Sequence, residues 1–198
     1  IVAPAMHEGM WTNPATAANV ETLRARGVRV VGPVQGALAH GDEGWGRMSE
    51  PDDILAAFDV VVASLHVART QPRERLTERL IGAIAHPHVD VIAHPTGRLL
   101  GERDPYDVDV DALIAACART GTFLEINANP RRLDLRPEHA RAAIEAGVRL
   151  CISSDAHRPD GLDVLRYGVD TARRGWAAKA DIVNTRTWPQ IRKLRKRR

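Results

Sequence analysis

Four short apolar segments in the second part of the chain each lead into a histidine, glutamate or aspartate. They are Val60–His66, Val89–His94, Phe123–Asn127 and Leu150–His157. Helical patterns alternate with them, near residues 72–86, 109–120, 137–146 and 160–174. This alternation predicts an α/β fold with parallel strands and outer helices. In a parallel barrel the carboxyl ends of the strands meet on one face, so we expect these polar side chains to gather there.

Composition fits a globular domain and argues against several other classes. The chain has 198 residues, of which 44% are hydrophobic and 27% charged, as in ordinary globular proteins. No apolar run approaches the roughly 20 residues of a membrane span, and no signal-peptide pattern is present, so we expect no membrane partner. Cys117 and Cys151 lack Cys-x-x-Cys spacing and are expected to be buried free thiols, which favours a cytoplasmic location. The basic tail at residues 192–198 suits either a phosphate backbone or a solvated helix end.

The order of elements predicts two domains. Residues 1–50 are rich in glycine and proline, with one helical pattern near residues 15–26 and one strand at residues 28–31. The alternating pattern begins after them, and a final helix is expected from Trp188. Three glycines are expected to end helices: Gly121, Gly147 and Gly175. We therefore expect domains at residues 1–54 and 55–198, joined without a flexible linker.

The side chains after the strands are of the types that bind transition metals. His66 and His94 each follow an apolar strand, and Asp155 and His157 follow another in an Asp-x-His pattern. Neutral imidazole and carboxylate groups suit zinc, manganese or iron. A lone histidine at such a place is more often an ordinary polar residue, but three strands that end in this way indicate a site descended from a metal centre. Glu125, on a further strand, is expected mainly to bind other side chains.

Cationic and amide side chains lie close to these candidate ligands. Arg98 comes four residues after His94, and its guanidinium suits the bidentate binding of a phosphate. A surface ion pair is the alternative role for Arg98. Asn127 and Arg131 follow the strand that carries Glu125, and we take both as candidate substrate contacts.

The chain from residue 58 onward resembles the carboxyl-terminal half of a PHP (polymerase and histidinol phosphatase) domain, in particular the one attached to bacterial family X DNA polymerases. The matching segments are Phe58–His66, His94–Arg98, Glu125–Pro130, Ser154–His157 and Tyr167–Trp176. The resemblance implies a distorted seven-stranded β/α barrel that holds three metal ions, usually manganese or zinc. It also implies phosphoester hydrolysis, with 3′–5′ exonuclease or phosphatase action on DNA ends in the polymerase-linked members.

The resemblance assigns roles to single residues. His66 and His94 would ligate one ion, Asp155 a second and His157 a third, while Arg98 would steady the phosphate. The metals would make a hydroxide nucleophile from water, which gives Asp155 a catalytic role beside Arg98.

The same resemblance exposes an incomplete ligand set. The earlier ligands of the family, which include a His-x-His pair and a bridging glutamate, have no counterpart in residues 1–57. A partial PHP barrel and a phosphoesterase by ancestry are therefore predicted, with activity dependent on whether anything completes the site. We expect a phosphoester substrate, with DNA as a candidate, and self-association through open sheet edges.

Residues 3–16 and 36–48 resemble a different family, the flavoprotein half of bacterial phosphopantothenoylcysteine decarboxylase. A Pro-Ala-Met-Asn loop of that family has His7 in place of asparagine, and His40 stands where a flap cysteine is found. Most of the flavin-binding domain is absent from the sequence, so we do not expect FMN as a cofactor. The resemblance changes between residues 50 and 58, which suggests a chimera: a natural recombinant, an engineered fusion or an assembly error.

Three classes of function stay open at this point. The first is a metal-dependent phosphoesterase, and the second is a fragment of a flavin-dependent decarboxylase. The third is a non-catalytic remnant that binds a metal or nucleic acid.

Overall fold

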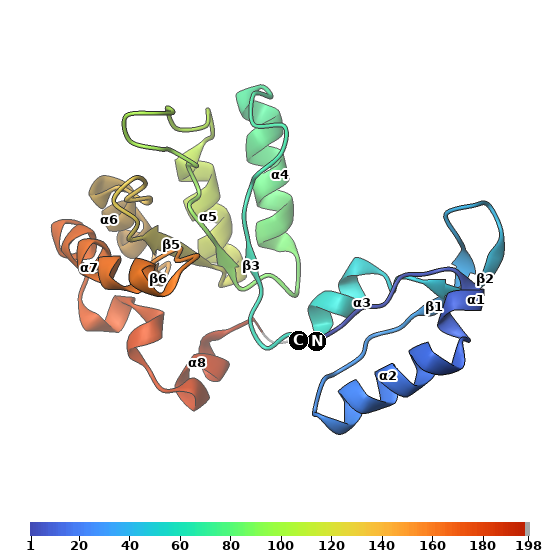
Figure 1. The fold of residues 1–198 in the computed structure, drawn as a ribbon. Coiled ribbons are helices and arrows are strands. Elements are labelled where there is room, and N and C mark those ends of the chain that lie inside the picture. The colour runs from blue at the N-terminus through green and yellow to red at the C-terminus, as the bar shows by residue number, and fades with distance from the viewer. Residues whose placement is uncertain (197–198) are drawn as a thin grey trace. The chain divides into compact units, whose positions relative to one another are not determined.

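The computed structural model describes residues 1–196 and divides the chain into two compact units, Ile1–Asp59 and Val60–Arg198 (Figure 1). The division lies close to the domain boundary expected from the sequence. The part of the predicted basic tail formed by Arg197 and Arg198 lies outside the described residues.

The smaller unit combines short helices with one antiparallel hairpin. Its elements are α1 (Glu8–Trp11), α2 (Pro14–Ala25), β1 (Val34–Ala37), β2 (Glu43–Arg47) and α3 (Pro51–Ala56). Helix α2 begins after Asn13, whose side-chain oxygen accepts the N–H of Ala15 at 2.9 Å, and proline occupies its first position. The predicted helix is thereby confirmed. The strand predicted at residues 28–31 is reduced to one parallel bridge between Val2 and Val30.

The larger unit is built on a four-stranded parallel sheet in the order β3-β4-β5-β6. The strands are β3 (Val62–Ala63), β4 (Val91–Ile92), β5 (Phe123–Asn127) and β6 (Leu150–Ser153). The helices are α4 (Arg73–Ala85), α5 (Val110–Thr120), α6 (Pro137–Glu145), α7 (Leu165–Arg174) and α8 (Trp188–Leu194). Short 3₁₀ turns lie at Pro159–Val164, Lys179–Asp181 and Val183–Thr185. Each strand pairs with the next one along the chain, so the α/β class is confirmed, while closure into a barrel stays a prediction.

The ends of the helices follow from local chemistry. Helix α5 begins where the Asp109 carboxylate accepts the N–H of Ala112 at 2.9 Å, and it ends at Gly121, whose φ of 75° is left-handed. Gly175 also ends its helix as predicted, but its φ is −82°. Glycine is needed there because a Cβ would lie 2.9 Å from the carbonyl oxygen of Pro137. Close packing of α7 against α6, rather than backbone conformation, therefore explains this glycine.

The core of the larger unit surrounds the two central strands, and β5 is buried along its whole length. Its largest fully buried hydrophobic side chains are Leu76, Ile84, Ile92, Leu113, Leu124, Ile126, Leu135 and Leu150. Strand β3 lies at the edge of the sheet, and Val62 on it is 56% exposed. No helix in residues 1–196 is long and apolar enough to cross a membrane.

Candidate functional site

Two of the predicted metal ligands lie together after β3 and β4. The rings of His66 and His94 are 5.1 Å apart between centroids and meet edge to face. His94 is 5% exposed, and its Nδ1 has no hydrogen-bond partner among the described residues. Burial and the nearby charge of Arg132 lower the pKa of His94 to about 4. A neutral imidazole with an unpartnered nitrogen is well suited to bind a metal ion.

Glu125 on β5 fixes the position of His94. Its carboxylate accepts the backbone N–H of His94 at 2.6 Å, the side-chain amide of Asn127 at 3.2 Å and the hydroxyl of Ser153. Burial raises the pKa of Glu125. The expectation that Glu125 binds other side chains is confirmed. Asn127, a candidate substrate contact, is fully buried, and its side-chain oxygen accepts the N–H of Asn129 at 3.0 Å, so it braces Glu125 from within the core.

Asp155 and His157 lie after β6. The Oδ2 of Asp155 is 3.0 Å from the Nε of Arg132, and these two side chains are only 24% and 16% exposed. His157 is exposed, and its Nδ1 is 2.9 Å from the backbone carbonyl of Asp155. The negative charge of Asp155 raises the pKa of His94. This carboxylate therefore lies near the histidine pair.

The residues present fit part of a metal centre. The unpartnered nitrogen of His94 and the adjacent ring of His66 offer two imidazole ligands. Across residues 1–196, no group of three or more His, Cys, Asp or Glu side chains is arranged to hold a metal ion. The complete three-metal ligand set implied by the sequence resemblance is not assembled within residues 1–196.

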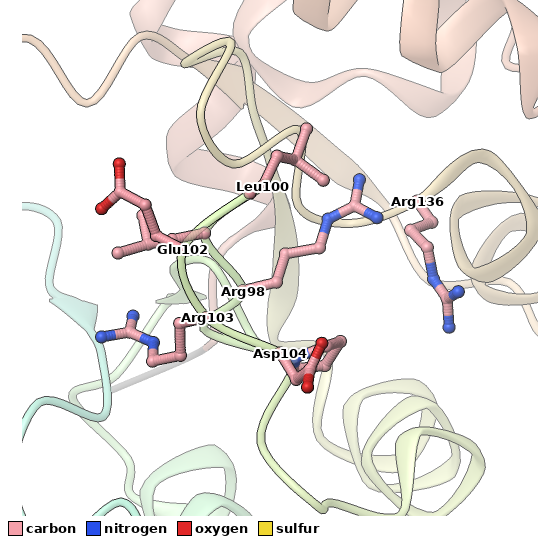
Figure 2. A pocket seen from close by; sticks show the side chains of 9 residues that line it. Arg98, Leu100, Glu102, Arg103, Asp104 and Arg136 are labelled. Carbon is pink, nitrogen blue, oxygen red and sulfur yellow. The ribbon is translucent and has the colours of Figure 1, made fainter.

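Arg98 lies in a different cavity from Asp155 and His157. Its Nε donates to the carbonyl of Arg132 at 2.7 Å, and its Nη2 donates to the carbonyl of Leu133. It lines a cavity of about 400 Å³ (Figure 2), whereas Asp155 and His157 line another of about 340 Å³. The sequence alone placed all three residues at one reaction centre. Arg98 therefore lines a cavity separate from the one that Asp155 and His157 line.

Arg131, the other cationic candidate, is exposed and forms an ion pair with Glu102. Its backbone N–H donates to the side chain of Asn129 at 3.0 Å. Arg131 therefore forms a surface ion pair, which is the role that the sequence analysis gave as the alternative for Arg98.

Two residues near the site were not singled out from the sequence. Arg132 holds Asp155, as described above, although the two residues are 23 positions apart. Asp134 is fully buried, and its Oδ2 accepts the backbone N–H groups of Thr96 at 3.0 Å and Gly97 at 2.8 Å. Burial raises the pKa of Asp134 to about 6. The sequence signal for both was a polar run directly after a strand, a place where functional side chains often lie.

The smaller unit has a cavity of its own. His7 and His40, the two positions at which the sequence departs from the decarboxylase pattern, both line a cavity of about 370 Å³. The Nε2 of His7 is 3.7 Å from a carboxylate oxygen of Asp42.

Comparisons with known proteins divide the chain in the same way. Residues 1–64 match the family model described as Flavoprotein. The coenzyme A biosynthesis bifunctional protein CoaBC of Mycolicibacterium smegmatis is 50% identical over 62 residues, which are 31% of this chain and 15% of that protein. The predicted resemblance of the amino-terminal part to a flavoprotein is confirmed.

Most of the chain matches another class of protein. The DNA polymerase/3′-5′ exonuclease PolX of Bacillus subtilis is 45% identical over 152 residues, which are 77% of this chain and 27% of PolX. Probable phosphatases of Caldanaerobacter subterraneus and of a Thermoanaerobacter species are 37% and 34% identical, each over 57% of this chain. The larger part of the chain has PHP-type phosphoesterase ancestry. This PHP-type part is joined to a flavoprotein-like part, as expected of a chimera.

The matches cover only part of each relative, and two of them overlap along this chain. The chain spans about a quarter of PolX and less than half of each phosphatase, with 27%, 45% and 47% of their lengths covered. Because 152 of 198 residues leave at most 46 unmatched, the PolX match includes residues 47–152 wherever it starts. It therefore overlaps the flavoprotein match over residues 47–64.

Proposed function

We propose that this chain is a remnant of a metal-dependent phosphoesterase that acted on DNA 3′ ends, and that it binds a divalent ion without turnover of its own. The PHP-type ancestry and the histidine pair support metal binding. The observation that carries the absence of turnover is the lack of a third ligand for this pair in residues 1–196. Loss of most ligands of a metal centre removes much of the electrostatic stabilisation of the transition state.

The residues of the chain have defined parts in this proposal. His66 and His94 hold the ion, and Glu125 keeps His94 in place through its backbone N–H. A bound manganese or zinc ion would polarise a phosphoester oxygen and acidify a water molecule. Asp155 and His157 lie on the next strand end, where the carboxylate is neutralised by Arg132. The catalytic roles assigned to Arg98 and Asp155 by resemblance belong to the ancestral enzyme in this proposal.

Elemental analysis tests the metal-binding half of the proposal. The full chain, loaded with Mn²⁺ or Zn²⁺ and freed of excess ion, is expected to retain one ion or fewer per chain. His66→Ala should abolish retention, because one imidazole alone binds too weakly. His40→Ala, at an exposed histidine of the smaller unit, is the matched control and should retain the ion. Equal retention by the wild-type chain and His66→Ala would contradict the proposal.

A hydrolysis assay tests the other half. With manganese present, release of nucleotides or of 3′-phosphate from a single-stranded DNA oligonucleotide is expected to be no faster than in His66→Ala and Asp155→Ala. Two or more ions per chain, together with turnover that both substitutions abolish, would show an active phosphoesterase and overturn the remnant proposal.

A flavin-dependent decarboxylase fragment is the second candidate. Its support is the cavity shared by His7 and His40 together with the flavoprotein match. Bound FMN gives a yellow protein, so a purified chain that is colourless and takes up no added FMN would reject this candidate.

A further inference from the structure

The cavity at Arg98 is lined by three arginines, and the histidine pair does not account for them. Arg98, Arg103 and Arg136 all line it (Figure 2). Arg98 is held by two backbone carbonyls of the segment after β5, and Arg103 donates twice to the carbonyl of Gly97. Main-chain oxygens thus orient both side chains without neutralising them. A guanidinium fixed in this way is prepared for an anion at little further entropic cost.

None of these three arginines has an ion-pair partner among residues 1–196. The ion pairs around the cavity join Arg131 to Glu102 and Arg132 to Asp155 instead. In Figure 2 the side chain of Arg98 extends toward Arg136, whereas Arg103 points the other way.

Charges of both signs act on Arg98. Burial lowers the pKa of Arg98, and so does the positive charge of Arg136, whereas the carboxylates of Asp134 and Glu138 raise it without forming an ion pair with Arg98 among the described residues. Asp104 also lines the cavity, but it forms no ion pair with either arginine among the described residues. A bound anion would relieve the repulsion between the two cations.

Arg132 connects this cavity to the one that Asp155 and His157 line. Its backbone carbonyl accepts from Arg98, and its side chain holds Asp155. Arg132 therefore contacts one residue that lines each cavity, and an extended polyanion suits such an arrangement better than a single phosphate does.

We propose that Arg98 and Arg136 form a binding site for a non-reacting backbone phosphate of single-stranded DNA. This inference deepens the proposed function and rests on it for the choice of nucleic acid. Arg98 supplies a fixed guanidinium, and the exposed Arg136 closes on the phosphate from the segment before α6. A mononucleotide or free phosphate lacks the second anchor and binds more weakly.

Binding without metal tests this site apart from catalysis. The full chain in chelator and low salt is titrated into a fluorescein-labelled single-stranded thymidine oligonucleotide, and anisotropy is followed. Arg136→Ala is expected to weaken binding about tenfold, since it removes a charge-assisted contact. It should also reduce the salt dependence by about one phosphate contact. The side chain of Arg136 has no hydrogen bond or ion pair within residues 1–196, so its removal leaves the fold intact, which circular dichroism verifies.

Arg119→Ala is the matched control, because Arg119 is exposed on α5 and carries the same charge. Equal losses in Arg136→Ala and Arg119→Ala would reveal diffuse attraction and overturn the proposal. Competition by inorganic phosphate or pyrophosphate as effective as by unlabelled oligonucleotide would assign the site to free phosphate groups and overturn the choice of DNA. Because metal is absent throughout, failure of metal retention or of the hydrolysis result leaves this outcome unchanged.

Discussion

At the scale of single residues, Asp134 ties the loop after β4 to the segment after β5. It accepts two successive backbone N–H groups, yet its other oxygen, Oδ1, is buried without a hydrogen-bond partner among the described residues. Desolvation outweighs the two hydrogen bonds, and the pKa rises from 3.8 to about 6. The carboxylate thus holds the loop in place while its charge is costly to bury.

This raised pKa predicts a pH dependence of stability. A carboxyl group whose pKa is higher in the folded than in the unfolded chain favours folding fully below pH 4 and loses that contribution as pH rises through 6. Asp134→Asn keeps one acceptor but does not titrate. Between pH 4 and pH 7 the wild-type chain is therefore expected to lose up to about 3 kcal/mol of unfolding free energy relative to Asp134→Asn.

Urea unfolding of both proteins across this range measures the difference. Asp111→Asn, at an exposed carboxylate on α5, serves as the control for removal of a surface charge. A flat difference for Asp134→Asn would show that burial does not raise this pKa.

Residue types at strand ends were readable from the sequence, but their pairings were not. The periodic pattern located His66, His94 and Asp155 correctly after parallel strands. The contact between Arg132 and Asp155 depends on how the turn after β5 folds back, because nothing in residue spacing encodes a contact over that distance. The burial of Asn127 was likewise hidden, since an amide directly after a strand has the same pattern whether it faces substrate or core.

At the scale of elements, helix α7 packs unusually close to the sheet. Gly168 lies on its buried face, and a Cβ there would come within 2.5 Å of Ile152 and 2.8 Å of the Ala128 side chain. Gly82 on α4 is the opposite case, because a Cβ there would meet no atom within 4 Å beyond its own stretch of helix backbone. Both glycines lie inside helices, so replacement by alanine brings the same gain in helix propensity at both positions.

Alanine substitutions at these two positions are expected to have opposite effects. Gly168→Ala should lower the free energy of unfolding by about 1–3 kcal/mol through overpacking. Gly82→Ala should raise it by about 0.5–1 kcal/mol, because alanine is the better helix former. Chemical denaturation followed by circular dichroism measures both changes. Stabilisation by both substitutions would mean that α7 does not contact the sheet as closely as described.

Long amphipathic elements were predictable, whereas glycine-rich and short ones were not. Helices α4 to α8 and the strands between them follow the hydrophobic period. The hairpin β1–β2 was read as loop because Gly36, Gly44 and Gly46 suppress strand propensity. Helix α3 has six residues and two acidic side chains in its first turn, a pattern that was interpreted as a junction.

At the scale of the whole molecule, the two units differ in how much core they have. Of the hydrophobic residues in Ile1–Asp59, only Val20 and Ala57 are buried, whereas most of the buried side chains belong to the larger unit. A unit of about 60 residues is marginally stable even with a good core. The smaller unit is therefore the less stable part of the chain.

Hydrogen–deuterium exchange is expected to separate the units. Amides of the hairpin, residues 34–47, should exchange at least about 100-fold faster than those of β5, because local opening of a small unit costs less free energy. Strand β5, buried along its length, is the internal reference. Equal protection of both segments, read by mass spectrometry of peptic peptides, would contradict this difference in stability.

Strand β3 lies within residues 47–64, the stretch that both ancestral matches share. The same few residues therefore satisfy the constraints of two different classes of protein. At such a place one gene can continue into another without a change of strand register, because the segment already serves both parents. A chain that changes ancestry within this stretch keeps α3 and β3 intact, whichever of the two classes supplies their residues.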